Sequence, residues 1–169
     1  MATPRNPQTI KGYRIGNSAS KPPKLAPYPA QIVQDPTRPR HVLDHALARR
    51  GLLEEIKRNA LAMEQICDAD PYLLRAATHH GEQTERECPV CHKSQLIHVT
   101  YTYGDDLGYL SGRVRTPDEL IEMAHEFGHF QVYVVEVCVR CHWNHLYLSY
   151  ALGDGKPRPI PRTPSDVLE

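Results

Sequence analysis

Apolar side chains in the stretch that begins at His41 recur three and four residues apart. This spacing gathers them on one face of a helix, so the stretch is predicted to be helical, with a break or bend at Gly51. Further along, Asp70 and Pro71 are residue types that cap and open a second helix. The whole of 40–81 is therefore predicted to be a helical segment. The apolar positions of its first stretch are Val42, Leu43, Ala46, Leu47, Leu52, Leu53, Ile56 and Leu61.

Three short helices in that segment would also allow a helix-turn-helix. The last of them carries a single arginine, Arg75. A helix that reads the major groove usually presents several polar side chains to base edges. A small helical hairpin is therefore the simpler interpretation.

The second half of the chain predicts strands around one helix. Apolar and polar side chains alternate over Leu96–Tyr103, Phe130–Val137 is a β-branched run, and Trp143–Tyr150 predicts a third strand. Between the first two, residues 116–119 (Thr-Pro-Asp-Glu) are typical of a capping box with proline at the first helical position. The helix that they open is predicted to end near Gly128.

Four of the five cysteines form two C-x-x-C pairs, Cys88 with Cys91 and Cys138 with Cys141. Two such turns brought together give a closed tetrathiolate site, which is typical of structural Zn²⁺. The first pair leads into one predicted strand, and the second lies between the other two. This predicts a zinc ribbon with a three-stranded antiparallel sheet. The 46 residues between Cys91 and Cys138 exceed the ~15–20 of compact sites, and the inserted helix accounts for them.

Four thiolates on one divalent ion leave about two negative charges, which cationic neighbours and amide donors should stabilise. Arg86, Lys93 and Arg140 are placed in the sequence to do so. These three side chains are therefore predicted to surround the metal centre.

Other interpretations of the cysteines are buried thiols without an ion and a redox dithiol pair, as in thioredoxin-type motifs. His92 and His142 each follow a pair and are candidates to replace one thiolate, although an exposed or supporting imidazole is the simpler expectation. The fifth cysteine, Cys67, is expected to be a small core residue of the helical segment.

A rival site lies on the inserted helix, where residues 125–129 match H-E-x-x-H. In metalloproteases His125 and His129 would bind a catalytic zinc and Glu126 would activate water. At 100° per residue, however, these side chains fall opposite the apolar stripe of the helix and face outward. The match therefore supports only an alternative hypothesis, a zinc-dependent hydrolase.

Length and composition narrow the class of protein. The chain has 169 residues and a mass of 19.2 kDa, which allows one domain with tails. No stretch approaches the ~20 apolar residues of a bilayer span, and the first residues lack the apolar core of a signal peptide. Cysteines in C-x-x-C pairs fit a reducing compartment. We therefore expect a cytoplasmic protein without a membrane segment.

The overall charge balance conceals a strong asymmetry. Residues 1–50 carry nine Lys and Arg against two acids, whereas 51–150 carry eight basic and fifteen acidic residues. Prolines cluster at both ends of the chain. Residues 1–39 are therefore predicted to be a basic arm and 154–169 a Pro-rich tail, each disordered or extended. The zinc ribbon with its inserted helix is predicted to occupy 82–153.

The basic arm is either a solubilising tail or a contact for nucleic acid or an acidic protein. Aromatic rings of the strands are further candidates for contact with a partner, although about half of them should be core. The candidate partner-binding residues are Lys11, Arg14, Lys21, Lys24, Arg38, Arg40 and Trp143.

One family resemblance adds to this picture. Residues 134–146 around the second cysteine pair, together with 88–91 and 70–77 upstream, resemble an uncharacterised actinobacterial family of small zinc-ribbon-like proteins from mycobacteria and corynebacteria. The resemblance covers about 41–153 and implies a zinc-bound cytoplasmic protein without an assigned activity. The pattern of that family includes neither the H-E-x-x-H match nor the long arm.

The sequence thus predicts an α+β protein with N-terminal short helices, a zinc ribbon and extended tails. The expected function is that of a non-enzymatic adapter with one structural Zn²⁺. Its partner would belong to the transcription or translation machinery or be nucleic acid, as is frequent for zinc ribbons. The oligomeric state is left open.

Overall fold

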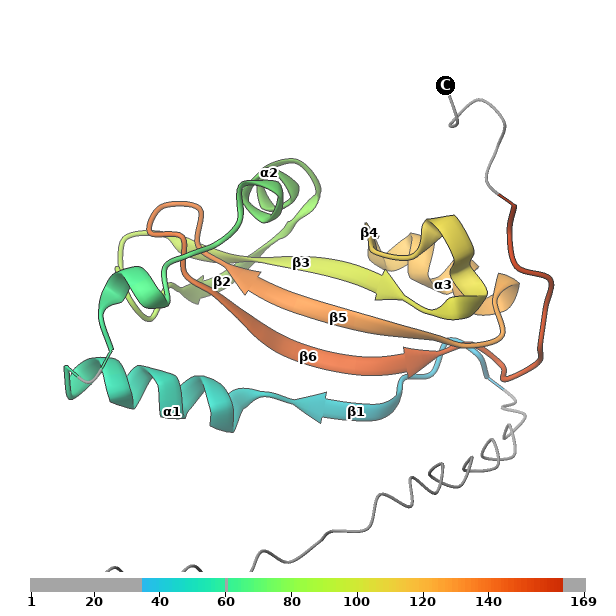
Figure 1. The fold of residues 1–169 in the computed structure, drawn as a ribbon, viewed down its shortest axis with the longest axis horizontal. Helices are drawn as coiled ribbons and strands as arrows, with labels where there is room; N and C mark the ends of the chain where they lie inside the picture. The colour runs from blue at the N-terminus through green and yellow to red at the C-terminus, as the bar shows by residue number, and fades with distance from the viewer. Residues whose placement is uncertain (1–34, 60, 163–169) are drawn as a thin grey trace, which may run out of the picture.

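The computed structural model describes residues 35–59 and 61–162. Its centre is an antiparallel sheet with the strand order β1-β6-β5-β3-β2, and β4 pairs with β3 outside this path (Figure 1). Helices pack beside and over this sheet, so the fold is mixed α and β, as predicted. The strands are β1 (Arg40–Asp44), β2 (Glu82–Glu87), β3 (Gln95–Tyr103), β4 (Arg113–Val114), β5 (Phe130–Val137) and β6 (Asn144–Leu152). The helices are α1 (Ala46–Lys57), α2 (Pro71–His80) and α3 (Pro117–Glu126), with 3₁₀ turns η1 (Met63–Gln65) and η2 (Asp105–Leu110).

The three strands that the sequence predicts are β3, β5 and β6, and they lie side by side. β5 occupies the middle, with Ile97 opposite Val137 on one side and Asn144 opposite Val137 on the other. Its alternate side chains are buried, including Phe130 and Val132. The sheet is wider than the predicted three strands, however, because β1, β2 and β4 extend it.

The prediction that the chain is helical from His41 is wrong. Residues 40–44 form β1, which pairs with β6, and the helix begins only at Ala46. The Asp44 side chain accepts a hydrogen bond from the Ala46 amide at 2.7 Å, which fixes this start. A register shift between Arg40 and Leu43, with His41 at φ 51°, breaks the regular alternation of the strand. Without that alternation the sequence resembles a helix.

Helix α1 runs without interruption through Gly51, which was expected to break or bend it. α1 lies beside β6, whereas α2 packs on β3 and β5, so the two do not form the helix pair of a helix-turn-helix (Figure 1). β1 and these helices come from 40–81 and contact strands from 82–153. The two predicted segments therefore build one sheet. Within the described residues, no helix has both the length and the hydropathy needed to cross a bilayer.

Helix α3 begins with the predicted capping box. The Thr116 hydroxyl accepts from the Glu119 amide, and the Glu119 carboxylate accepts from the Thr116 amide. Proline follows at the first helical position, where its missing N–H costs nothing. The buried side of the helix packs with β5 and η2 in one core cluster. Its members are Leu107, Leu120, Met123, Ala124, Phe127, Phe130, Val132 and Leu152.

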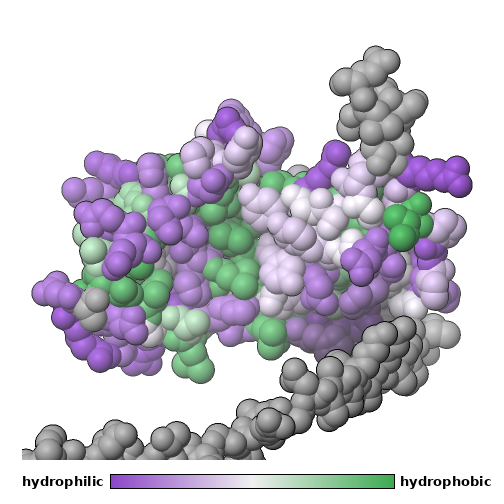
Figure 2. Space-filling model, in the orientation of Figure 1, coloured by the Kyte–Doolittle hydropathy of each residue, from purple (hydrophilic) through white to green (hydrophobic). Residues whose placement is uncertain are grey.

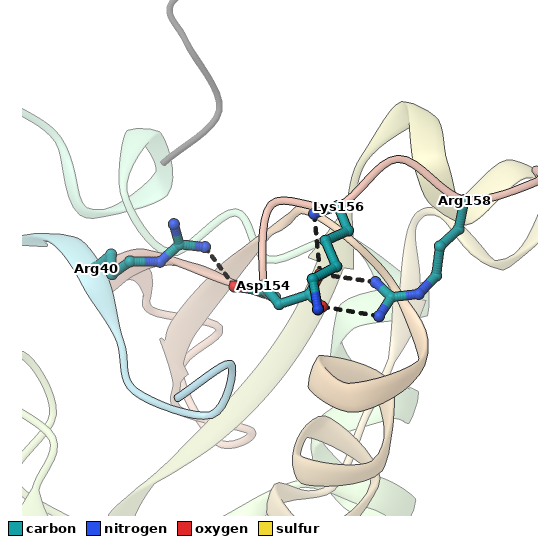
Figure 3. A network of polar contacts seen from close by, with 5 residues as sticks. Arg40, Asp154, Lys156 and Arg158 are labelled. Atoms are coloured by element: carbon teal, nitrogen blue, oxygen red, sulfur yellow. Dashed lines mark hydrogen bonds and ion pairs between the residues drawn. The ribbon is translucent and has the colours of Figure 1, made fainter. Parts of the chain in front are cut away.

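The first part of the predicted tail is held near the start of β5, where the Gly155 amide donates to the Gly128 carbonyl. Arg158 donates two hydrogen bonds to the Asp154 carboxylate, at 2.8 and 2.9 Å, and Lys156 contacts the same group (Figure 3). Hydrogen bonds from Arg158 hold the pKa of Asp154 below its usual range. Residues 155–162 have no helix or strand, which agrees with an extended tail.

Candidate metal centre

Two turns of nearly the same shape carry the four paired cysteines. In the first, between β2 and β3, the Cys88 amide donates to the Ser94 carbonyl and the His92 amide to the Cys88 carbonyl. In the second, between β5 and β6, the Cys138 amide donates to the Trp143 carbonyl and the His142 amide to the Cys138 carbonyl. His92 and His142 close these turns with left-handed backbones, φ 50° and 67°. Both imidazoles are exposed.

The sulfur atoms of the two turns meet. Sγ of Cys88 lies 3.6 Å from that of Cys141, and Sγ of Cys91 lies 3.7 Å from that of Cys138. All four sulfurs lie within 4.8 Å of one another, and in the described part of the chain this is the sole group of three or more metal-ligating side chains so arranged. Cys88 and Cys138 are fully buried. The predicted pairing of distant cysteines in one cluster is therefore confirmed.

Hydrogen bonds prepare one of these sulfurs for a cation. Burial alone would raise the pKa of Cys138, but bonds from the Ser94 hydroxyl, at 3.0 Å, and from the amides of Cys141 and Arg140 lower it to about 7. The pKa of Cys88 is raised to about 11 because burial dominates there. Ser94 crosses from the first turn to the second. Sequence reasoning missed this residue, because serine in a turn gives no signal of a contact with a distant cysteine.

The three cations that were predicted to surround the cysteines, Arg86, Lys93 and Arg140, form no side-chain hydrogen bond to the sulfur atoms in the described part of the chain. The Arg86 guanidinium lies over the Tyr147 ring, 5.0 Å from its centroid. Lys93 and Arg140 have exposed side chains, and among the described residues no hydrogen bond joins any of the three side chains to a sulfur. Backbone amides and a hydroxyl supply the donors instead, since turn geometry points them at the sulfurs.

Trp143 was expected to be a candidate for partner binding, and the structure corrects this. Its ring is 0% exposed and packs with Ile66, Leu96 and the buried cysteines in a second core cluster. Trp143 is the last residue of the second turn, so the turn that gathers the cysteines also drives this ring inward. Cys67 packs half-buried against the same cluster, and burial raises the pKa of its thiol.

The H-E-x-x-H residues do not share a helix. α3 ends at Glu126, and the backbone of Phe127 is extended, so His129 lies beyond the helix and not one turn after His125. His125, Glu126 and His129 are exposed, and Nε2 of His129 lies 3.4 Å from the side-chain amide of Gln131. The two imidazoles therefore lack the spacing of a metalloprotease helix.

Most of the predicted basic arm lies outside the described residues. This applies to Lys11, Arg14, Lys21 and Lys24. Arg38 is exposed. Arg40 donates to the Gly153 carbonyl at 2.6 Å, because β1 lies beside the end of β6 (Figure 3).

Comparisons with known proteins assign the chain that carries this cysteine centre to a family. Residues 37–165 match a family described as a family of unknown function (DUF5318). The chain belongs to this family. The uncharacterized proteins Rv0049 of Mycobacterium tuberculosis and Mb0050 of Mycobacterium bovis are each 48% identical to it over 120 residues, which are 71% of this chain and 88% of theirs. The resemblance to an uncharacterised mycobacterial family is thereby confirmed. No solved structure matches this DUF5318 chain.

Beside the centre lies a polar row that the sequence analysis did not single out. His98, Glu136 and His145 stand opposite one another on β3, β5 and β6. Glu136 is 0% exposed and accepts hydrogen bonds from Arg49, at 2.5 Å, and from the Trp143 indole, at 3.0 Å. Each of these residues lies on a different strand, so the sequence cannot show that they form one row until the register of the sheet is known.

These two histidines predict a loss of stability in acid. Burial lowers the pKa of both His98 and His145 below 6.5. As the pH falls through 6.5, the unfolded chain therefore takes up protons that the folded chain does not, and the free energy of unfolding decreases until the folded pKa values are reached. Urea unfolding of the wild type and of His98→Gln, compared between pH 7.5 and 5.5, should show a shallower decrease for the variant. Equal slopes would contradict the assignment.

Proposed function

We propose that this protein is a non-enzymatic adapter whose two β-hairpins are joined by one structural Zn²⁺. The sulfur positions carry the proposal. A zinc ion bound at about 2.3 Å by four sulfurs in a tetrahedron requires the sulfurs to lie about 3.8 Å apart. The two contacts at 3.6 and 3.7 Å fit that spacing. Four thiolates are also the donor set that favours zinc over harder cations.

Complete coordination by four cysteines makes the proposed ion a structural one. Four cysteines fill the tetrahedron and leave no position for water or substrate, whereas catalytic zinc keeps one position open. When bound, zinc would link the end of the β2–β3 hairpin to the end of the β5–β6 hairpin, which is the arrangement of a zinc ribbon. Reduced thiols are required, so we place the protein in the cytoplasm.

The β1–α1 region supports a role in binding a macromolecule. Val42 and Leu43 on β1 are 53% and 60% exposed, and Leu47 at the start of α1 is 83% exposed. Figure 2 shows apolar atoms on the surface over the α1 end of the molecule. Large apolar side chains left exposed at the edge of a sheet are typical of a contact with another protein. Zinc ribbons in transcription and translation complexes offer a precedent by analogy of fold.

Zinc content distinguishes the adapter from the hydrolase hypothesis. We expect one zinc per chain by elemental analysis of the purified protein, because the four cysteines bind one ion. Glu126→Gln should leave zinc content and thermal stability unchanged, since Glu126 is exposed. Two ions per chain, or a hydrolytic activity that Glu126→Gln removes, would contradict the adapter.

The partner surface is tested by placing a negative charge at its most exposed side chain, Leu47. Tagged protein from its native cells should capture a defined partner, and Leu47→Glu should lose it while keeping its zinc and its circular dichroism spectrum. Ile160→Glu is the matched control, because Ile160 is 57% exposed and lies far along the chain on the tail. Equal capture by both variants, or no specific partner, would contradict the proposed surface.

A further inference from the structure

A basic pocket lies between α1 and the sheet, on residues to which neither the family nor the proposed function gives a role. Its volume is about 370 Å³. Four cations and one carboxylate, Glu54, line it, and a second carboxylate, that of the buried Glu136, pairs with Arg49 from behind the lining. The cations come from different elements: Arg49, Arg50 and Lys57 from α1, and Arg86 from β2. An excess of positive charge around one hollow favours an anionic occupant.

The pocket contains one arginine that is held rigidly. Arg49 is only 17% exposed, and its Nε donates to Oε1 of the fully buried Glu136. The Trp143 indole donates to the same oxygen. Among the described residues no hydrogen bond joins the terminal nitrogens of Arg49 to another group. Its guanidinium is therefore fixed on one edge, with free N–H donors remaining, and a donor fixed in advance loses little entropy on binding.

The sheet next to this arginine carries two buried polar atoms. Oε2 of Glu136 and Nε2 of His98 find no hydrogen-bond partner among residues 35–59 and 61–162. His98 in turn stacks on Tyr147, which lines the pocket, with ring centroids 4.8 Å apart. Buried polar atoms in native proteins are almost always paired. Neither Glu136 nor His98 lines the pocket, so the cations of α1 and β2 carry its attraction for an anion.

We propose that this pocket binds a phosphate group. The fork of arginine N–H groups matches phosphate oxygens, and two arginines from different elements can grip one phosphate from two sides. One face of the Tyr147 ring stacks on His98 and Arg86 lies over the ring, so it is not free to stack on a base. The site therefore recognises phosphate without regard to the base, either on a free nucleotide or in a nucleic-acid backbone. This inference goes beyond the adapter function and does not depend on it.

The pocket is joined to the metal centre by a short series of contacts. The Cys138 amide donates to the Trp143 carbonyl, the Trp143 indole to Glu136, and Glu136 accepts from Arg49. Glu136 and Trp143 are thus positioning residues, because they act on phosphate only through Arg49. Affinity for phosphate should consequently decrease when this series is interrupted, even when the cysteines keep their ion.

Titration calorimetry of the zinc-loaded full-length protein tests the pocket, with inorganic phosphate, AMP and a short oligothymidylate as probes at low salt. Arg86→Gln and Lys57→Gln should each weaken phosphate and AMP binding about tenfold, the size of one lost charge-assisted contact. Arg58→Gln is the matched control: Arg58 bonds to Glu54 as Arg50 does, but does not line the pocket. We expect Arg58→Gln to bind phosphate and AMP with the affinity of the wild type.

The probes also identify the source of the phosphate. If Arg86→Gln weakens oligothymidylate binding as much as AMP binding, the site takes a nucleic-acid backbone. If only phosphate and AMP respond, the site takes a free ligand. If phosphate and AMP do not bind, or if the wild type, Arg86→Gln and Lys57→Gln bind them with equal affinity, the proposed phosphate site is wrong. None of these results depends on partner capture through Leu47, so the two proposals fail separately.

Trp143→Phe tests the positioning series. Phenylalanine keeps an aromatic ring in the core but removes the N–H that holds Glu136. We expect unchanged zinc content and an affinity for phosphate several-fold lower than that of the wild type. A variant that keeps zinc and also binds phosphate as tightly as the wild type would show that Trp143 has only a packing role.

Discussion

Replacement of Cys138 with serine is expected to unfold the sheet around the two cysteine turns. Cys138 is fully buried at the end of β5, and its sulfur meets both Cys91 and Ser94. Structural zinc sites supply on the order of 10 kcal/mol of folding free energy. Whole domains are stable by only about 5–15 kcal/mol. Loss of one of four ligands should therefore consume most of the stability of the protein.

Circular dichroism, urea unfolding and elemental analysis check this prediction on the same samples. Cys138→Ser should lose zinc together with its cooperative unfolding transition. Cys67→Ser is the matched control, since Cys67 packs against the same cluster but is not one of the four cysteines whose sulfurs meet. We expect it to keep one zinc per chain and nearly all of its stability. A zinc-free Cys138→Ser protein that is as stable as the wild type would contradict a structural metal centre.

The parts of the fold that the sequence predicts are those in which local pattern and final environment agree. β5 has buried side chains at alternate positions, and α3 begins at a capping box whose hydrogen bonds are all local. The four cysteines could be identified for the same reason, because each C-x-x-C pair needs only one tight turn. Periodicity and capping depend on neighbours a few residues away.

The missed strands are those at the edges of the sheet. β2, with the sequence EQTERE over 82–87, is almost entirely exposed, so it has no apolar alternation. β1 is distorted by a register shift. An edge strand buries little and is specified mainly by hydrogen bonds to its neighbour, which sequence periodicity does not reveal. Polar residues in edge strands therefore look like loops, and a bulged strand that leads into a helix looks like part of it.

The polar surroundings of the site were beyond sequence reasoning because their partners are distant in the chain. Glu136 meets Arg49 across 87 positions, and Ser94 meets Cys138 across 44. A glutamate between valines in a strand is normally expected to face solvent. Trp143 was named a candidate for partner binding for a similar reason, since an aromatic residue beside a turn has no local signal of burial.

The buried ion pair between Arg49 and Glu136 predicts the second large effect. Arg49→Met removes the cation and leaves the fully buried carboxylate of Glu136 with the Trp143 indole as its one remaining donor among the described residues. Breaking a buried pair in this way typically costs about 3–5 kcal/mol. We expect urea unfolding to show a loss of that size. Arg50→Met is the matched control, because Arg50 is 79% exposed and pairs with Glu54 on the same helix, and it should change stability by less than about 0.5 kcal/mol.

A double-mutant cycle separates the charge from the packing. In Arg49→Met/Glu136→Gln the buried group is a neutral amide, which costs far less to bury than a carboxylate. The double variant should therefore be more stable than Arg49→Met alone, although it carries one substitution more. Additive losses from the two single variants would show that the pair is not coupled. A double variant more stable than the single one would show that the cost of Arg49→Met is the unpaired charge on Glu136, the group that also fixes Arg49 in the proposed phosphate pocket.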